Sequence, residues 1–441
     1  MRPKRKIGLV LLMMTLILAA CGGGQSSEQG GGNEGKQDKV KLTIWHNFAG
    51  DDLRAKSVRS FIDQFAQDHP EVTLDAQAIP PDGYRQRLST VAAANEMPDV
   101  FFVYAGSQSA ELHQANLLQP ITEVLDKNSE WRDNFLPGAF DPYEFEDGQI
   151  YSAPLGMSAT SIFFYNKALF EQHNVKVPTT WDEMMTAVNT FNDNGITPIA
   201  LGNKAPWVAQ STIIGSIADR VTGTDWFMNA AAQDGAKFTD PEFIDALGYF
   251  KELVDNKAFQ EGANSIDNTQ AEQYFIQGNA AMMISGAWTL TNLAASSTEE
   301  QMQDIEVGVL PEIPGGKGEG NTITGGAGGG LALSSRTEGK AKELALELIY
   351  AVSGPEAQKA IAESNSMVMY NTDIDEAKVT PLYYKAFNLV KETPVTPVYD
   401  AYLSAEAAEV INNGLQEIMM GGAVEGVAQK LQDAQARSKT P

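Results

Sequence analysis

The order of strand and helix patterns after residue 39 constrains the fold of this chain most strongly. In "KVKLTIWHNF", Val40, Leu42 and Ile44 alternate with other residues, as expected for a strand with one buried face. Apolar residues at helical spacing follow between 58 and 65, a second strand covers 72–79, and another helix leads to the apolar strand in "PDVFFVYAG". This βαβαβ order predicts a parallel sheet, whose ligands bind beyond the carboxyl ends of the strands.

A second α/β unit follows the first. It starts near "EDGQIYSAPLGMSATSIFFYNKALFEQ", where we expect a strand from Ser161 to Tyr165. The sequence "TWDE", from Thr180 to Glu183, has the spacing of a capping box and predicts the start of a helix. An amphipathic helical stretch from about 402 to 437 ends the chain. With 441 residues the chain exceeds the usual size of one hydrophobic core, so we expect an α/β protein with two lobes.

The N-terminus has the pattern of a secretory signal. Four basic residues precede an apolar run from Ile7 to Ala20, which is shorter than the about 20 residues that span a membrane. The sequence "LAAC" then resembles a lipobox, so we expect a signal peptide over 1–20 and acylation of Cys21, as by palmitate. The alternative is a free or buried thiol beside a signal peptidase site. Residues 21–39 would form a lipid-anchored flexible linker, and the single cysteine excludes a disulfide framework.

The charge of the chain excludes two classes of partner. Its formal net charge is −25 at pH 7. Four of the 32 basic residues and none of the 57 acidic ones precede Cys21, so removal of the signal peptide would change the charge to −29. This balance argues against nucleic acid and against membrane binding through a basic patch. The membrane contact that we expect is therefore the lipid anchor alone.

The sequence shows no catalytic or metal-binding motif. Its histidines, His46, His69, His113 and His173, lie far apart without HExxH, and no G-x-S-x-G elbow occurs. The glycine clusters "PGGKGEGN" and "TGGAGGGLALSS" lack the Lys-Ser/Thr pair of a phosphate loop. We expect no cofactor, no metal and no catalytic residue, while bound calcium stays open because the acidic residues 373–376 lack an EF-hand pattern. Carboxylates are plentiful, so a glycosidase pair also stays open.

Aromatic residues near the ends of predicted strands indicate a carbohydrate site. A sugar ring has apolar faces and a rim of hydroxyls, so it needs flat aromatic platforms with polar groups beside them. Residues of these kinds are Trp45, His46, Asn47, Tyr104, Lys204, Trp207 and Trp288. The alternative for each aromatic is a place in the core, and His46 alone would more often be structural. Trp131, Trp181 and Trp226 lie in or beside helical segments, where we expect packing.

The ordered motifs of the chain resemble those of extracellular solute-binding lipoproteins of carbohydrate ABC importers, in the maltose-binding-protein-like group. The motifs are "LAAC", "LTIWHNF", "MPDVFFVYAG", "SIFFYNKALFEQHNVKVPTTWDEM", "FIQGNAAMMISGAW", "GVLPEIPGG" and "TGGAGGGLALS". The resemblance implies a two-lobed periplasmic-binding-protein fold, type II-like, with the ligand cleft between lobes joined by a multi-segment hinge. Lobe one would comprise 40–150 and 311–353, and lobe two would comprise 151–310 and 354–441.

The resemblance also implies a set of ligand-binding residues distributed over both lobes. Trp207 and Trp288 would be stacking platforms, and Lys204 would donate to hydroxyls. Lobe one would contribute His46, Asn47 and Tyr104, and the backbone would approach the ligand at Gly325 and Gly326. Tyr399 and Asp400 lie in "TPVYDAYL", which resembles the late binding segment of the family.

The function implied by the resemblance is that of a receptor. A monomeric, lipid-anchored protein on the extracellular face of a bacterial cytoplasmic membrane would bind an oligosaccharide and deliver it to an ABC permease, without catalysis. One competing hypothesis is a surface-anchored glycoside hydrolase or other polysaccharide-acting lipoprotein. Another is a sensor or adhesion lipoprotein that binds a partner protein through its acidic face.

Overall fold

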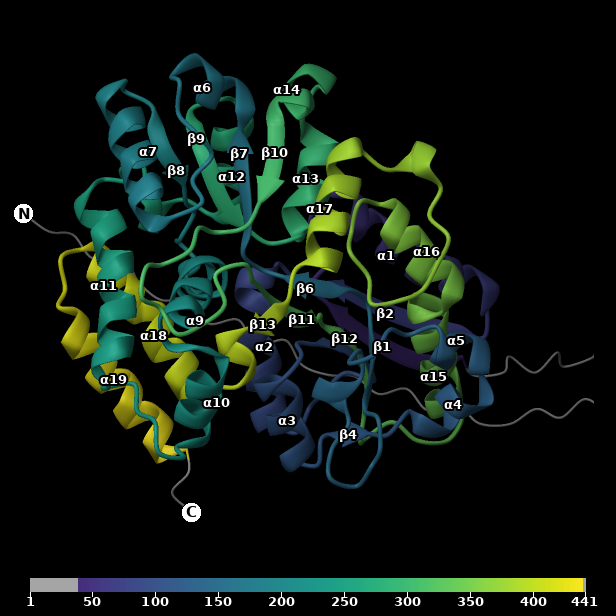
Figure 1. Ribbon diagram of the computed structural model, residues 1–441. Coiled ribbons are helices and arrows are strands. Elements are labelled where there is room, and N and C mark those ends of the chain that lie inside the picture. The colour runs from purple at the N-terminus through teal and green to yellow at the C-terminus, as the bar shows by residue number, and fades with distance from the viewer. Residues whose placement is uncertain (1–38, 439–441) are drawn as a thin grey trace, which may run out of the picture. The chain divides into compact units, whose positions relative to one another are not determined.

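The computed structural model describes residues 39–438 (Figure 1). The predicted signal peptide, Cys21 and nearly all of the predicted linker lie outside these residues. Within them, no helix combines the length and the apolar character needed to cross a membrane.

A six-stranded sheet contains the first unit of the sequence. Its order is β2-β1-β3-β12-β4, and β5 also pairs with β12. The strands are β1 (Val40–His46), β2 (Val72–Ala78), β3 (Val100–Val103), β4 (Leu118–Gln119), β5 (Ser152–Pro154) and β12 (Gly330–Ser334). Because β1 pairs parallel with both β2 and β3, the predicted βαβαβ unit is confirmed. β12 joins this sheet antiparallel to β3 from about 230 residues further along the chain. The resemblance had placed 311–353 with 40–150, but the sequence did not reveal this pairing.

Helices α1 (Leu53–Asp68) and α2 (Pro81–Ala93) are the crossovers of this unit. Asp52 caps α1, because its side chain accepts a hydrogen bond from the Ala55 N–H at 2.9 Å. Against α1 pack α15 (Gly339–Ser353) and α16 (Pro355–Glu363). The core of the first sheet extends into α16 through Ile361 and Ala362, beyond the predicted boundary at 353. Smaller helices on this side are α3 (Ser107–Gln114), α4 (Thr122–Lys127) and α5 (Ser129–Asp133).

The second unit is built on a four-stranded sheet with the order β10-β7-β9-β8. Its strands are β7 (Ile162–Asn166), β8 (Thr197–Ala200), β9 (Ala280–Ser285) and β10 (Ile305–Gly308). The expected strand near 161–165 is thus confirmed as β7. The helices that follow in the chain are α6 (Lys167–Gln172), α7 (Trp181–Asp193), α8 (Trp207–Ala209), α9 (Gly215–Thr222), α10 (Thr224–Ala232), α11 (Pro241–Asp255), α12 (Asn268–Ile276), α13 (Trp288–Ser296) and α14 (Glu299–Asp304). The predicted capping box starts α7, with Thr180 and Glu183 bonded to each other's backbone N–H groups.

The C-terminal part of the chain adds three helices, which are α17 (Pro381–Glu392), α18 (Ala405–Met419) and α19 (Val424–Arg437). The expected helical stretch from about 402 to 437 is confirmed, and it consists of two helices, α18 and α19. Gly421, with φ of +93°, and Gly422 separate α18 from α19, because a backbone in the left-handed region ends a helix.

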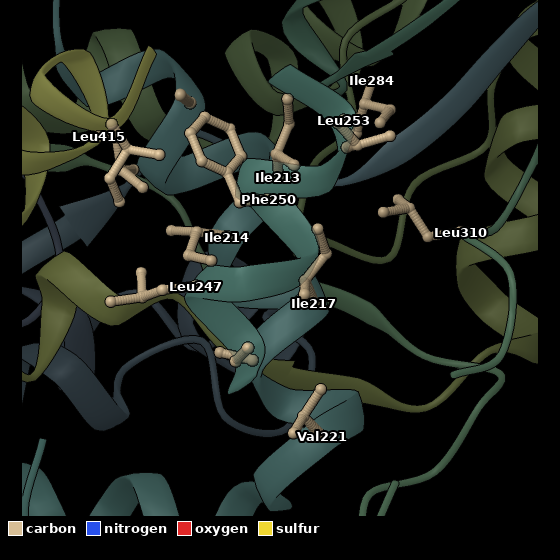
Figure 2. Packing of buried hydrophobic residues seen from close by; sticks show 14 of the residues in the cluster. Ile213, Ile214, Ile217, Val221, Leu247, Phe250, Leu253, Ile284, Leu310 and Leu415 are labelled. Carbon is tan, nitrogen blue, oxygen red and sulfur yellow. The ribbon is translucent and has the colours of Figure 1, made fainter. Parts of the chain in front are cut away.

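Figure 2 shows part of the core that α18 and α19 share with the second unit. Its labelled members are Ile213, Ile214, Ile217 and Val221 from the segment 210–222, Leu247, Phe250 and Leu253 of α11, Ile284 of β9, Leu310, and Leu415 of α18. Such close packing of branched side chains fixes the helical segment 207–222 against β9. The start of the segment 207–222 and the end of β9 therefore have defined positions.

A third sheet, with the order β13-β11-β6, lies where the chain passes between the first two. Its strands are β6 (Met157–Ala159), β11 (Ile323–Ala327) and β13 (Val395–Pro397). β6 directly follows β5 of the first sheet, and β11 directly precedes β12 of that sheet. The lobe boundaries inferred from sequence stay a prediction, and the packing of α16 favours a later end for the second segment of lobe one.

Candidate ligand-binding site

Trp207 and Trp288, which are 81 residues apart in the sequence, lie side by side. Their ring centroids are 5.6 Å apart with an interplanar angle of 69°. Trp207 begins α8, and Trp288 begins α13 shortly after the buried strand β9. Both side chains are half-buried, and the indole N–H of Trp288 is buried without a hydrogen-bond partner. Gly286 makes room for this ring, because a Cβ there would overlap it.

A π-helical turn, η2 (Gln210–Ile214), directly follows Trp207 and α8. Gln210 is completely buried, and both its Oε1 and Nε2 atoms lack a partner. An unpaired buried amide is costly, so a partner from outside the described protein atoms is expected here. Single π turns often mark functional sites. The sequence analysis missed Gln210, because neither its burial nor the π turn leaves a pattern in the sequence.

A second wall of the candidate site comes from the ends of β1 and β3. Asn47 Nδ2 donates to the Tyr104 hydroxyl at 2.9 Å, while Asn47 Oδ1 is buried and unpaired. The guanidinium of Arg85 lies 4.0 Å from the centroid of the Tyr104 ring. This cation–π contact and the hydrogen bond from Asn47 hold the Tyr104 ring in place.

A contact between α1 and α13 joins the two walls. The Thr291 hydroxyl lies 3.5 Å from Oδ1 of Asp52, the capping residue of α1, and also donates to the carbonyl of Trp288 at 2.8 Å. Asp52 and Tyr104 both act electrostatically on Arg54, the second residue of α1. The Trp207–Trp288 pair and the Asn47–Tyr104 pair are therefore connected through neighbouring residues.

The glycines predicted for the site lie in β11, where they have different roles. Gly325 pairs with Ala159 of β6, and a Cβ on Gly325 would overlap the Ser158 carbonyl. Gly326 has a φ of +144° and open space in the direction of a Cβ, as expected where a ligand approaches the backbone. Beside them, the Thr324 hydroxyl is buried without a partner.

Four of the residues predicted for the site lie elsewhere or have protein partners. His46 is 2% exposed, and its Nδ1 accepts a hydrogen bond from the Phe48 N–H. Burial, helped by the charge of Arg59, lowers the pKa of His46 to about 4, so the ring is neutral at pH 7. Lys204 is exposed, and Tyr399 is buried in the core, stacked on Phe227 at 3.7 Å.

Asp400 is the fourth of these residues, and it connects the C-terminal segment to helices of the first unit. Its carboxylate pairs with Arg85 of α2 at 3.0 Å, and its carbonyl accepts a hydrogen bond from Ser107 of α3 at 2.7 Å. Glu111 of α3 also accepts from the Ala405 N–H at 3.3 Å. These contacts make Asp400 a residue that joins the two units. Its role as a ligand contact stays a prediction.

A buried glutamate supports α13 from behind Trp288. Glu272 is completely buried and accepts hydrogen bonds from Thr289 at 2.7 Å, Asn292 at 2.6 Å and Asn268 at 2.8 Å. Burial, despite these hydrogen bonds, raises the pKa of Glu272 to about 7, and the charge of Asp52 adds to the rise. Glu272 therefore bonds to the first turns of α13 through a carboxyl group whose protonation changes near neutral pH.

We expect this glutamate to make stability depend on pH between about 4.5 and 7. In this range the folded protein keeps the proton of Glu272 while the unfolded chain has released it, so the free energy of unfolding falls as pH rises, by about 3 kcal/mol in total. Glu272→Gln should remove that contribution, whereas the exposed Glu425→Gln should not. Melting temperatures measured from pH 5 to 8 would test this. Parallel curves for the wild type and Glu272→Gln would contradict the assignment.

The candidate site is identified by its chemistry, and two hollows of the molecule lie away from it. One hollow of about 260 Å³ lies along α12 beside Gln270 and Gln273, and another of about 300 Å³ lies beside Val177 and Glu312. Neither is lined by the residues predicted from sequence. Several buried polar atoms without a partner belong to residues of the candidate site or to their neighbours in the chain, and they are Asn47 Oδ1, Arg54 Nε, both Gln210 side-chain polar atoms, Trp288 Nε1 and Thr324 Oγ1. Other unpaired atoms, such as those of Tyr383 and Asn412, belong to residues outside it. Within residues 39–438 no group of His, Cys, Asp and Glu side chains is arranged to hold a metal.

Comparison with known proteins decides the family. The family model described as "Bacterial extracellular solute-binding protein" matches residues 51–359. The chain belongs to this family. A multiple sugar-binding protein of Streptococcus mutans is 24% identical over 312 residues, which cover 69% of this chain and 70% of that protein. The matched segments span between 55% and 70% of the first curated relatives.

Solved structures of this family have the same fold. A structure from work on xylan utilization by the thermophilic bacterium Caldanaerobius polysaccharolyticus has a TM-score of 0.81 and 29% identity, and covers 89% of this chain and 99% of that one. A chitin oligosaccharide binding protein has a TM-score of 0.83 and 24% identity, and covers 90% of this chain and 100% of that one. These matches confirm the predicted two-lobed α/β fold, and the family comprises solute-binding proteins.

Proposed function

We propose that this family member is the sugar-binding receptor of an ABC import system and that its ligand is an oligosaccharide. The observation that carries the proposal is the Trp207–Trp288 pair, in which the Trp288 N–H has no partner and which is followed directly in the chain by the unpaired amide of Gln210. Indole faces suit the apolar faces of sugar rings. The unpaired atoms include the donor Trp288 Nε1 and the acceptor Asn47 Oδ1, and Gln210 offers both, as hydroxyl groups require. The names of several relatives, which refer to sugars, support the same class of ligand.

The mechanism that we propose is closure of the lobes around the ligand. A sugar held between Trp207 and Trp288 on one side and Asn47 and Tyr104 on the other contacts both walls only in the closed state. It shifts the open-to-closed equilibrium by its difference in affinity for the two states. The contacts of Asp400 would add to the stability of the closed state without touching the sugar. A membrane permease would then recognise the closed form and receive the sugar.

The cellular setting is part of the proposal. Cleavage before Cys21 and acylation of that cysteine would anchor the chain on the extracellular face of the cytoplasmic membrane, with the linker 21–39 as a tether. We propose a monomer that performs no catalysis, with lobe one over 40–150 and 311–353, extended toward α16, and lobe two over the rest.

A thermal-shift screen of the protein against mono- and oligosaccharides, with analysis of the sugars afterwards, tests this function. A ligand at 100 times its dissociation constant should stabilise the folded state by about 2.7 kcal/mol. Selective stabilisation by an intact oligosaccharide supports the receptor. Cleavage of the sugar would favour the glycoside hydrolase instead, and the absence of a shift with any sugar would contradict sugar binding.

A further inference from the structure

We propose that Arg54 binds an acidic substituent of the sugar, the carboxylate of a uronic acid residue. This inference rests on the proposed sugar-binding function. It further specifies that the sugar ligand has a negative charge. It comes from the environment of one side chain, which neither the motifs nor the names of relatives specify.

Arg54 has few protein partners for the donors that it carries. Its Nε is buried without a hydrogen bond, and its Nη2 lies 3.4 Å from the Leu155 carbonyl oxygen, which is a weak interaction. The guanidinium carbon lies 5.1 Å from the centroid of the Phe48 ring, so one face is covered. Among the described residues, no ion pair within 4.0 Å involves Arg54. The edge of the guanidinium therefore has donors to offer to a ligand.

The position of Arg54 is unfavourable for the protein alone. Burial lowers the pKa of this guanidinium, although Asp52 and Tyr104 oppose the change. Arg54 also occupies the first turn of the 16-residue helix α1, where the helix dipole disfavours a positive charge. Asp52 offers limited compensation, because its Oδ1 accepts from the Ala55 N–H and is close to the Thr291 hydroxyl. An anionic ligand would supply both the missing acceptors and the missing charge.

Arginines are concentrated in the first two helices of this acidic protein. Four of the eight arginines within residues 39–438 lie in α1 and α2, and they are Arg54, Arg59, Arg85 and Arg87. Arg59 donates to the Phe48 and Gly50 carbonyls, Arg85 pairs with Asp400, and Arg87 bonds to Gln77 and covers the Trp45 ring. These three have partners, so Arg54 is the member available to a ligand.

A carboxylate fits Arg54 better than a neutral hydroxyl does. The planar guanidinium presents parallel N–H donors that match the two oxygens of a carboxylate, and charge-assisted bonds of this kind are about twice as strong as neutral ones. Arg54 lies near Asn47 and Tyr104 on the second wall of the candidate site. One sugar residue could then stack on an indole while the acidic group of a neighbouring residue reaches Arg54.

Isothermal titration calorimetry on the full-length protein can test this with matched sugars. The probes are oligogalacturonates and glucuronic-acid-bearing xylo-oligosaccharides, each compared with the same oligosaccharide after reduction of its carboxyl group. We expect one acidic probe to bind at least about tenfold more tightly than its reduced form. Arg54→Met should abolish this preference, because it should weaken binding of the acidic form about tenfold more than binding of the reduced form. The control Arg87→Met should keep the preference.

Each outcome bears on a separate part of the proposal. Equal or tighter binding of the reduced sugars by the wild type would overturn the acidic ligand and leave the sugar receptor intact. A preference for sulfated over carboxylated oligosaccharides would overturn the uronic acid. If no sugar binds at all, the proposed function fails and this inference fails with it. The comparison of probes uses the wild type, so it does not depend on the folding of a variant.

Discussion

Replacing Trp288 by alanine is expected to weaken oligosaccharide binding roughly 30- to 100-fold, a loss of about 2–3 kcal/mol. The indole is half-buried, lies against Trp207, and keeps an unpaired N–H. Truncation removes both the stacking surface and this donor, and it leaves Trp207 without its neighbour. The double replacement of Trp207 and Trp288 should abolish detectable binding. Titration calorimetry with the best oligosaccharide from the thermal-shift screen measures the change.

Two matched variants make this prediction specific. Gly286→Ala should also weaken binding, because its Cβ would displace the Trp288 ring without removing it. Trp226→Phe should leave affinity unchanged, since Trp226 stacks on Phe243 in the core of the second unit. Full affinity of Trp288→Ala for every sugar would show that these rings are packing residues.

Replacing Arg220 by methionine is expected to lower the free energy of unfolding by about 4 kcal/mol and the melting temperature by roughly 5 °C. Arg220 is 1% exposed in α9 and donates to the Pro311 carbonyl at 3.1 Å, the Leu310 carbonyl at 2.9 Å and the Thr322 carbonyl at 3.0 Å. It also bonds to Ser216. Methionine fills a similar volume but leaves these buried oxygens unpaired, which accounts for the size of the loss.

The control for this stability prediction is Arg336→Met. Arg336 is exposed and donates to the Asn95 carbonyl, so its replacement should change the free energy of unfolding by less than about 0.5 kcal/mol. Chemical denaturation of the variants would compare them. The prediction would be contradicted if the free energy of unfolding of Arg220→Met lay within about 1 kcal/mol of the wild-type value. Other contacts would then hold the segment 310–322.

Apolar periodicity and a capping box in the sequence were sufficient to predict several strands and helices. The alternation at 40–44 and the helical spacing at 58–65 gave the parallel unit β1-α1-β2-α2-β3, and the Thr180–Glu183 capping box gave the start of α7. The assignment of Trp131 and Trp181 to packing is confirmed, since both are buried.

The alternation of β1 also contained a signal that the analysis did not use. Leu42, Ile44 and His46 are two residues apart, so they share the buried face of the strand. His46 therefore points inward, and Asn47, next along the chain, is available to Tyr104. If the period of two had been extended to the end of the strand, it would have predicted that His46 is buried and that Asn47 is available for the site.

Long-range packing determines what the sequence could not show. The pairing of β12 with β3 and the proximity of Trp207 to Trp288 depend on the tertiary fold. The unpaired amide of Gln210 and the unpaired Nε of Arg54 appear only when burial is known. The aromatic half of the candidate site was therefore readable from the sequence, and most of its polar half was not.

The most direct test is a crystal structure of the protein with the oligosaccharide that stabilises it most. The account predicts an intact sugar with a ring within about 4 Å of the Trp288 indole and with hydroxyls bonded to Asn47 or Gln210. A sugar bound elsewhere, for example in the hollow beside Gln270 and Gln273 of α12, would contradict the proposed site.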